Sequence, residues 1–471
     1  MAPTTTRDVV EAPKIEIALT IILGRDYLEH VAEETGNDYL DDKLAEFLLE
    51  TRRKALDWIV NQDPLQLRYD SPNLVQRFLL VLFYYQTTRH KPWKECNPAA
   101  SPQPSATSGF CYEPAFYTGE ATSNIWGDQW LSASHECQWA GITCETVQSV
   151  DRTVAELRLF RNDLNGPLPW EITRLPQLRI LGLSSNMLTG VLPPRLLSKR
   201  AGVALKSLDL SWNQFSGTIP TQWVPSFLEG NGKLTSLRLQ RNTLTGRIPS
   251  ELGLLPLKDI ILTRNTLTGS IPQEILNQTS LRRLYLGKND LTGTFPSEIG
   301  LLTNLEYLYL NHTHMSGSLP SEIGLANQLL EMILSNTNMQ GTLPKELYTG
   351  LNKLEFLYLD GCNFTGTISP SLGLLTHLIS LDVSNNHFHG TIPNEIVALT
   401  NLAQLVVNGN QITGTIPISF CRNLAYLEHG RFEVAFVADC LPSTETGVPA
   451  IQCASDCCTV CCDQTGVCLS T

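Results

Sequence analysis

One phrase of the sequence returns at a nearly fixed step. The stretch LRRLYLGKNDLTGTFPSEIG, residues 281–300, is followed by LEYLYLNHTHMSGSLPSEIG, residues 305–324. Aligning the whole chain to this phrase gives eleven copies, spaced by 23 to 29 residues and mostly by 24. A period in the twenties predicts a solenoid, because each repeat can bury its apolar face only against its neighbours. The first apolar anchors of the copies are Val154, Leu178, Leu205, Leu234, Leu257, Leu281, Leu305, Leu329, Leu354, Leu378 and Leu402.

Each copy reads L-x-x-L-x-L-x-x-N-x-L-x-G-x-I-P with substitutions. The L-x-x-L-x-L part predicts a short strand, in which the leucines point into the coil and the variable residues point out. Glycine stands at the thirteenth position of all eleven copies, and proline ends ten of them, with Ser369 as the exception. Glycine permits a tight turn there, and proline stops regular structure.

The ninth position of the repeat carries Asn in eight copies, where the strand must bend. A side chain with both a donor and an acceptor can satisfy the backbone groups of adjacent coils, so the sequence predicts a buried asparagine ladder. Thr313, Thr337 and Cys362 replace Asn in three consecutive copies. We expect a weaker ladder there, and we expect Cys362 to be a buried free thiol.

These residues resemble the plant-type leucine-rich repeat, with its L-x-G-x-I-P signature, over roughly residues 150–420. The resemblance implies an α/β repeat solenoid with a parallel inner sheet and short 3₁₀ or extended segments on the convex side. It also implies a protein that recognises other molecules. We expect four parts: an arm at 1–40 that is partly ordered, a helical N-terminal cap with disulfides at 41–150, the eleven repeats at 151–420, and a Cys-rich C-terminal cap at 421–471.

The N-terminal cap contains two helical patterns. Residues 41–60 place Leu44, Phe47, Leu48, Ala55 and Ile59 near one helical face. In the stretch SPNLVQRFLLVLFYY, Ser71 is the expected N-cap and Pro72 the first helical residue. The whole segment is similar to the N-terminal cap of receptor-like leucine-rich repeat proteins from diatoms and their relatives, in which a membrane helix often lies upstream.

The stretch HECQWAGITC, residues 135–144, resembles the Cys-x-Trp-x-Gly element that precedes plant-type repeats. The resemblance implies a disulfide between Cys137 and Cys144, with Trp139 packed on the first coil. Cys96 and Cys111 flank a Pro/Ser-rich loop that a disulfide could close.

Seven of the thirteen cysteines lie within residues 440–468. They could hold zinc or another soft metal, or they could form a disulfide knot that seals the last coil. The spacing gives no clean pair of C-x₂-C knuckles and the cluster has no histidine, so we favour the knot and expect no metal. The pairs that we expect are Cys96–Cys111, Cys137–Cys144 and Cys421–Cys440, with three bridges among Cys453, Cys457, Cys458, Cys461, Cys462 and Cys468.

The net charge of −12 makes nucleic acid an unlikely partner, since phosphate-binding proteins are typically basic. The clustered cysteines favour an extracellular or cell-surface location. The chain shows neither a clear signal peptide nor an apolar run long enough for a membrane helix, which we interpret as a truncated start or an unusual leader. A cytosolic protein with reduced thiols is the competing interpretation.

The sequence contains no spacing typical of a catalytic site, so we expect no enzyme and no cofactor. The pairs His312 with His314 and His387 with His389 are interpreted as solvated loop residues. Three tripeptides predict N-glycosylation and fit passage through the secretory pathway. They begin at Asn277, Asn311 and Asn363.

The repeat register also predicts a binding surface. The residue between the second and third leucines must face out on the inner sheet, which puts an apolar and aromatic run in the fifth to ninth copies, Ile261 to Tyr358. Neighbouring parallel strands lie about 4.8 Å apart, so this run forms one ridge. Arg241, Arg264 and Lys288 are expected on one flank, and Asp360 and Asp382 on the other. The predicted ligand-binding residues are Tyr285, Tyr307, Tyr309, Ile333, Phe356, Tyr358, Arg238, Arg264 and Arg283.

The aromatic residues could instead have a structural role, either by stacking for sheet stability or by packing under the chain's own N-terminal arm. The leading hypothesis is an extracellular, receptor-like recognition module. It would bind a peptide, protein or glycan on the concave face, and a membrane co-receptor would be a further partner. The alternatives are a secreted inhibitor of a cell-wall hydrolase and a structural or adhesive surface protein.

Overall fold

The computed structural model divides the chain into two compact units, Met1–Thr245 and Gly246–Thr471. It describes residues 42–68, 71, 73–89, 93, 130–147, 151–197, 204–224, 233–417, 419–420, 435–440, 450–452, 460–462 and 468–470. Several predictions lie outside these residues: those for the N-terminal arm and those for Cys96, Cys111, Cys421, Cys453, Cys457 and Cys458. The side chains of Leu44, Cys462 and Cys468 also lie outside the described set.

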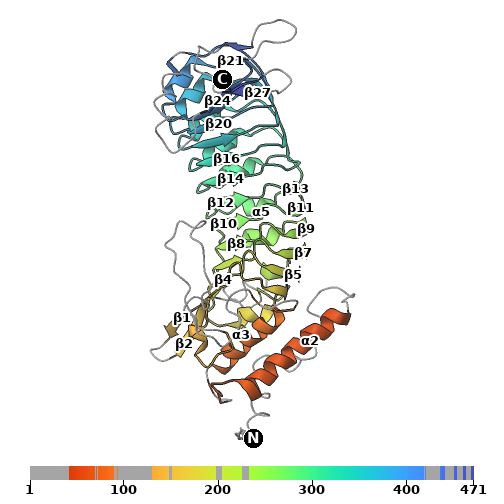
Figure 1. Cartoon of the computed structure of the whole chain (residues 1–471). Helices are drawn as coiled ribbons and strands as arrows, with labels where there is room; N and C mark the ends of the chain where they lie inside the picture. The colour runs from red at the N-terminus through yellow and green to blue at the C-terminus, as the bar shows by residue number, and fades with distance from the viewer. Residues whose placement is uncertain are drawn as a thin grey trace. The chain divides into compact units, whose positions relative to one another are not determined.

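The first unit begins with two packed helices, α2 (Asp42–Asp57) and α3 (Leu74–Gln86), which lie side by side in Figure 1. A π-helical turn, η2 (Trp58–Gln62), continues α2. Of the residues predicted on one helical face, Leu48, Ala55 and Ile59 are buried and Phe47 is half-buried. The apolar face of this helix therefore packs inward, as its period requires.

Helix α3 starts later than the sequence signal suggests. The N-cap is Asn73 rather than Ser71, and the first helical residue is Leu74 rather than Pro72. Ser71 instead belongs to a preceding turn, where its carbonyl accepts a hydrogen bond from the Leu74 amide at 3.1 Å. The Asn73 side chain does not cap the helix, because it is hydrogen-bonded to the His135 ring at 3.1 Å.

A buried charge cluster joins these helices to the segment that follows. The Arg77 guanidinium is fully buried and contacts Asp63 at 2.9 Å and Glu136 at 3.5 Å. It lies 5.3 Å from the ring centre of Trp58 and 4.7 Å from that of Trp139. Two carboxylates and two ring faces thus compensate one buried cation.

The segment that resembles the plant-type cap forms a short 3₁₀ helix, η3 (Glu136–Gln138), and an antiparallel strand pair, β1 (Ile142–Val147) and β2 (Asp151–Arg158). Cys137 is disulfide-bonded to Cys144, the pairing that the resemblance implies. Trp139 is fully buried and its ring centre lies 5.3 Å from that of Trp130.

The repeats of the first unit add parallel strands to β2. Three inner strands follow it in order: β4 (Ile180–Gly182), β6 (Ser207–Asp209) and β8 (Ser236–Arg238). A second, lateral set of strands runs through β3 (Asn165–Pro167), β5 (Met187–Val191), β7 (Gln214–Thr218) and β9 (Thr243–Arg247). The 3₁₀ helix η4 (Trp170–Arg174) lies between the strands of the first repeat and those of the next.

The second unit repeats the same plan. Its inner strands are β10 (Asp259–Ile261), β12 (Arg283–Tyr285), β14 (Tyr307–Tyr309), β16 (Glu331–Ile333), β18 (Phe356–Tyr358), β20 (Ser380–Asp382), β22 (Gln404–Val406), β24 (Ala435–Ala438), β26 (Val460–Cys462) and β27 (Cys468–Ser470). All pair in parallel from β10 to β26, and β27 closes the sheet as an antiparallel strand. Figure 1 labels β10, β12, β14, β16 and β20, which follow one another in this order.

Short helical turns stand between the strands on the side away from the inner sheet, and most are 3₁₀. They are η5 (Ser250–Leu254), α5 (Gln273–Leu276), η6 (Ser297–Leu301), η7 (Ser321–Leu325), α6 (Lys345–Gly350), η8 (Pro370–Leu374) and η9 (Asn394–Ala398). The predicted fold class is confirmed: a repeat solenoid with a parallel inner sheet and a 3₁₀-rich back.

Lateral strands also line the second unit, but their sheet is broken. Strands β11 (Thr266–Gly269) and β13 (Asp290–Leu291) belong to one sheet. Strands β15 (Ser316–Gly317), β17 (Asn338–Gly341), β19 (Asn363–Thr367), β21 (His387–Thr391), β23 (Gln411–Thr415) and β25 (Ile451–Gln452) belong to another. An isolated bridge links Thr294 to Ser316 where the two sheets meet.

The asparagine ladder forms as its chemistry predicts. In the first unit the Asn213 amide donates to the Leu210 carbonyl at 3.1 Å and to the Leu183 carbonyl of the previous coil at 2.9 Å. Its oxygen accepts the Leu188 amide at 3.0 Å. Each such Asn therefore ties two coils together with bonds that water does not reach.

The ladder changes at the three substituted positions in the second unit. The Thr313 and Thr337 hydroxyls donate to the carbonyls of their own coils, Leu310 at 2.8 Å and Leu334 at 2.9 Å. Cys362 is a buried thiol in no disulfide, and its sulfur lies 3.2 Å from the Thr337 hydroxyl and 3.4 Å from the Leu334 carbonyl. The break between β13 and β15 falls in the same coils.

One backbone feature recurs in all eleven coils. The eighth residue of each repeat has a left-handed conformation, with φ between 51° and 68°, although nine of the eleven are not glycine. These residues are Arg161, Ser185, Trp212, Arg241, Arg264, Lys288, His312, Asn336, Gly361, Asn385 and Gly409. The chain turns sharply at this residue, between the inner strand and the buried ladder position.

The C-terminal cysteines require one correction. The expected Cys421–Cys440 bridge is wrong, because Cys440 is bonded to Cys461. Cys461 was expected to pair with another of the six cysteines from Cys453 to Cys468. The two residues are brought together because strand β24 pairs in parallel with β26, which places Ala438 opposite Cys461. Among the described helices, none is both long enough and apolar enough to span a membrane.

Candidate ligand-binding face

Four inner strands of the second unit present the predicted ridge. The strand register pairs Tyr285 with Tyr309, Tyr309 with Ile333, and Ile333 with Tyr358. All four side chains are half-buried, whereas the leucines and methionine between them are buried in the coil. The period-two alternation of the strand therefore turns these side chains toward the inner face.

The tyrosines of this face pack on one another. The rings of Tyr285 and Tyr309 are parallel, with their centres 4.1 Å apart. The Tyr307 ring stands edge-on to Tyr285 at 6.4 Å. The Tyr309 hydroxyl donates a hydrogen bond to the Glu331 carboxylate. Ring stacking and this bond hold the aromatic surface in one arrangement before any ligand arrives.

Burial and neighbouring carboxylates keep the tyrosine hydroxyls protonated. Desolvation raises the pKa of Tyr285 to about 12. Desolvation and then the bond to Glu331 raise the pKa of Tyr309 further still. Both hydroxyls are therefore neutral donors over the whole physiological range.

The second row of the face lies two residues earlier on each strand. Here Arg283, Tyr307, Glu331 and Phe356 are in register on adjacent strands. The Arg283 guanidinium lies 5.6 Å from the ring centre of Tyr307 and forms an ion pair with Asp259 at 3.0 Å. The Phe356 ring stands edge-on to Tyr358 at 6.3 Å.

Charge is distributed unevenly along the inner face of the second unit. On and next to strands β10 and β12 lie Lys258, Arg264, Arg282, Arg283 and Lys288, with Asp259 as the acidic residue of these strands; the other acidic residues of the two coils, Glu274, Asp290 and Glu298, lie farther from the inner strands. The coils of β14 to β20 carry Glu306, Glu331, Glu355, Asp360 and Asp382. An ion pair between Arg282 and Glu306 at 2.6 Å joins the two regions. The aromatic ridge thus runs from a basic end to an acidic end.

Two further observations describe the acidic end. Desolvation raises the pKa of Asp382, which accepts the Ser384 hydroxyl at 2.7 Å. Asp360 accepts hydrogen bonds from the Ser335 hydroxyl and from the Asn336 amide.

The structure adds detail to the predicted map at four residues. Ile261 and Val406 occupy outward positions but are buried, at 8% exposure each, and in the register Ile261 lies directly beside the large ring of Tyr285. Arg241 lies over the Trp212 ring in the first unit, 3.6 Å from its centre. Arg238 is half-buried on β8 of the first unit, so the predicted set of nine residues is divided between the two units.

The remaining predicted positions lie at the surface. Arg264 is exposed at the left-handed position of its coil. Asn277 and Asn363 are exposed, while Asn311 is half-buried against the backbone of Gly287. His312, His314, His387 and His389 are exposed. Within the described residues there is no group of three or more His, Cys, Asp or Glu side chains placed to hold a metal ion.

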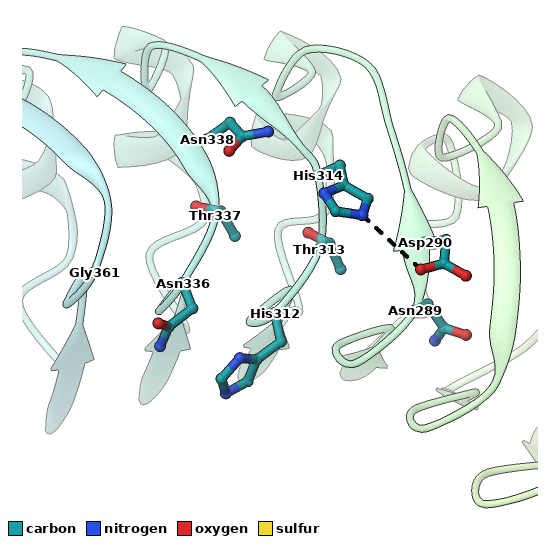
Figure 2. A pocket seen from close by; sticks show the side chains of 9 residues that line it. All are labelled: Asn289, Asp290, His312, Thr313, His314, Asn336, Thr337, Asn338 and Gly361. Atoms are coloured by element: carbon teal, nitrogen blue, oxygen red, sulfur yellow. Dashed lines mark ion pairs between the residues drawn. The ribbon is translucent and has the colours of Figure 1, made fainter.

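A polar hollow lies beside the interrupted ladder and was not predicted from the sequence. Its volume is about 470 Å³. Figure 2 shows Asp290, His314 and Asn338 along one rim, Asn336 and His312 along the other, and Thr313 and Thr337 between the rims. The sequence feature that coincides with the hollow is the substitution of Thr for Asn at two consecutive ladder positions, because Thr313 and Thr337 both line it.

Comparison with known proteins places this architecture in a family. The sequence matches the Leucine Rich Repeat model at residues 204–224, 233–255, 280–302, 304–325, 353–375 and 377–399. The structure resembles a leucine-rich repeat protein of Leptospira interrogans, with 31% identity, 64% of this chain and 69% of that chain covered, and a TM-score of 0.50. The chain belongs to the leucine-rich repeat family.

The leucine-rich repeats of this chain are of the plant type. They are 31% identical over 163 residues to Receptor-like protein 3 of Arabidopsis thaliana, covering 29% of this chain and 21% of that protein. The structure also resembles the Arabidopsis receptor kinase HAESA, solved in complex with the peptide hormone IDA and the co-receptor SERK1. That match has 32% identity and a TM-score of 0.54, and it covers 67% of this chain and 51% of HAESA. The chain thus spans about half of the HAESA chain, and far less of the plant receptors matched by sequence.

Proposed function

We propose that this protein is a receptor-like recognition module, acting outside the cell or at its surface, which binds a peptide ligand on the inner face of its second unit. The observation that carries the proposal is the in-register aromatic ridge from Tyr285 to Tyr358, already ordered by ring stacking. Rigid tyrosines lose little entropy on binding, and tyrosine with arginine is the usual composition of binding hot spots.

The charges that border the ridge indicate the composition of the ligand. A peptide lying along the stacked strands would meet Lys258, Arg264 and Lys288 at one end and Glu355 and Asp382 at the other. Such a surface fits a segment that is acidic at one end, apolar in the middle and basic at the other end. The HAESA structure, which contains a peptide hormone and a co-receptor, supports a peptide ligand and a second receptor chain as partners.

A selection experiment tests this proposal. Random peptides displayed on phage would be selected on the wild-type protein, and the affinity of the enriched peptide would be measured by calorimetry. The double variant Tyr309→Ala/Tyr358→Ala should weaken binding at least 30-fold, because it removes two ring contacts worth more than 1 kcal/mol each. The control Leu301→Ala/Leu374→Ala changes exposed side chains on the back of the coils and should leave affinity unchanged.

The same peptide with its sequence reversed tests the charge arrangement. It should bind at least tenfold more weakly than the original, and the difference should shrink at high salt. Equal affinity of the double variant and the wild-type protein for every selected peptide would exclude the inner face of the second unit as the site.

A further inference from the structure

The polar hollow of Figure 2 lies on the lateral side of the second unit, away from the outward positions of the inner strands that form the ridge. Three structural observations characterise it: the space itself, the chemistry of its lining, and the loss of stabilising contacts beside it.

The hollow adjoins two unusual residue choices in consecutive coils. Elsewhere an Asn at this position donates to the carbonyl of the preceding coil, as Asn386 does to Leu359 at 2.8 Å. Thr313 and Thr337 donate within their own coils. The lateral sheet is also interrupted at one edge of this region, between β13 in the coil of Asn289 and β15 in the coil of Thr313. The solenoid therefore lacks both the ladder bonds between coils and a continuous lateral sheet at this place. Such a loss of regular structure is typical of functional sites.

The lining is mostly polar, with a smaller share of apolar surface. It presents amides at Asn336 and Asn338, imidazoles at His312 and His314, and hydroxyls at Thr313 and Thr337. A single carboxylate, Asp290, lies 3.9 Å from the His314 ring. Among the residues that the structure describes, none forms a hydrogen bond or ion pair with the side chains of His312 and Asn338. Donors and acceptors are therefore available along both rims.

This chemistry selects among ligand classes. A purely apolar ligand would leave the polar majority of the lining without partners, and an anion would meet the Asp290 carboxylate. Among the described residues, no group of three His, Cys, Asp or Glu side chains could hold a metal ion there. A neutral sugar carries hydroxyls that donate and accept at once, which matches a lining of amides, imidazoles and one carboxylate. The hollow crosses the coils from Asp290 to Gly361, a span of roughly 14 Å at about 4.8 Å per strand, and its volume is in the range of small-ligand sites.

We infer that the hollow binds a short chain of neutral sugars. The sugar can come from two sources, and both sources present the same chemistry. One is an oligosaccharide in solution. The other is the protein's own N-linked glycan, since two predicted acceptor sites, Asn311 and Asn363, adjoin the rim residue His312 and the coil of Gly361.

The first test uses the full chain secreted with Asn277, Asn311 and Asn363 all changed to Gln, so that no N-linked glycan is attached. Triacetylchitotriose and cellotriose would be titrated, with binding followed by saturation-transfer NMR and calorimetry. At least one trisaccharide should bind. Failure of both to bind, in this protein and in the wild type, would overturn the inference.

Two variants in this background locate the site. Thr337→Asn should restore the ladder bond to the preceding coil, as Asn386 makes it, and so draw the coils that line the hollow into the regular arrangement. Affinity should fall at least tenfold while the melting temperature rises. Asp290→Ala should weaken binding by a similar factor with the fold unchanged. The control Thr391→Asn introduces the same side chain at an exposed position of β21 and should leave affinity unchanged. Unaltered trisaccharide binding by both Thr337→Asn and Asp290→Ala would exclude the hollow as the site.

The glycosylated wild-type protein distinguishes the two sources. If its own glycan fills the hollow, the wild type should bind the trisaccharide at least tenfold more weakly than the glycan-free variant, and Asn311→Gln or Asn363→Gln should restore the affinity. Equal affinity of the two forms assigns the hollow to a sugar in solution. The ridge is not involved in either outcome, so Tyr309→Ala/Tyr358→Ala should leave trisaccharide binding intact even if the proposed peptide ligand fails.

Discussion

Two arginines, one in each unit, make similar contacts but differ in burial, and the difference changes what each contributes. Arg77 in the first unit and Arg283 in the second each contact an aspartate at about 3 Å and lie near an aromatic ring. Arg77 is fully buried, while the side chain of Arg283 is 36% exposed. The cluster around Arg77 has a structural role, whereas that around Arg283 belongs to a surface that a ligand can reach.

The cost of removing one partner of an ion pair depends on whether water can reach the other partner. A buried ion pair has already lost its water, so removing one partner leaves the other charge uncompensated in a low-dielectric interior. At the surface, water and salt replace a lost partner at little cost. We therefore expect the caps to be sensitive to single substitutions and the inner face to tolerate them.

The largest effect is expected for Arg77→Met. It leaves Asp63 and Glu136 buried without their cation, and the free energy of unfolding from urea titration should fall by about 3–5 kcal/mol. Arg283→Met is the matched control and should cost less than about 1 kcal/mol. Similar losses for the two variants would remove the distinction between the clusters.

A smaller effect is expected in the ladder. Asn213→Thr can keep the bond to the Leu210 carbonyl of its own coil, as Thr313 does, but it loses the bonds to the Leu183 carbonyl and the Leu188 amide. The free energy of unfolding should therefore fall by about 2 kcal/mol. Asn401 makes a comparable bond to the Thr376 carbonyl of the preceding coil, but it is exposed. Asn401→Thr should therefore change stability by less than about 0.5 kcal/mol. A loss at Asn401 as large as that at Asn213 would show that burial is not what gives the ladder its strength.

The smallest effect is expected in alkaline solution. The pKa of Tyr285 is raised to about 12 from an ordinary value of 10.0, because burial disfavours the charged form. The unfolded chain releases this proton first, so the stability that it contributes is present below pH 10 and is lost as the pH rises toward 12. The tyrosinate absorbance of wild type minus that of Tyr285→Phe should show this late titration. A Tyr285 transition near pH 10 would mean that the ring is open to water.

Much of the solenoid could be predicted because its determinants are local. Every inward leucine, every turn glycine and the ladder positions are fixed by one short register, and the outward positions of Tyr285, Tyr309 and Tyr358 follow from the same period. The weakening at Thr313 and Thr337 was also predictable, since a hydroxyl has one hydrogen to donate and a shorter reach, whereas an asparagine amide has two N–H donors and a separate carbonyl oxygen.

The features that could not be predicted depend on contacts distant in sequence or on side-chain size. The burial of Ile261 depends on the coil beside it, which carries the large ring of Tyr285, and the period alone says nothing of that. Arg241 was expected to flank the ridge, but its coil faces Trp212 and the guanidinium lies on that ring. The Cys440–Cys461 bridge depends on which strands close the sheet, and cysteine spacing leaves many connectivities open.

The left-handed eighth residue has a practical consequence. Nine coils hold a side chain other than glycine in a conformation that costs about 1 kcal/mol or more, and the stacking of coils offsets this cost. Glycine would adopt the same turn without that penalty, as Gly361 and Gly409 already do. Thermal tolerance could therefore be raised in small, roughly additive steps by repeating one substitution from coil to coil, with Ser185 and Trp212 as the first candidates and the residues of the proposed binding face left untouched.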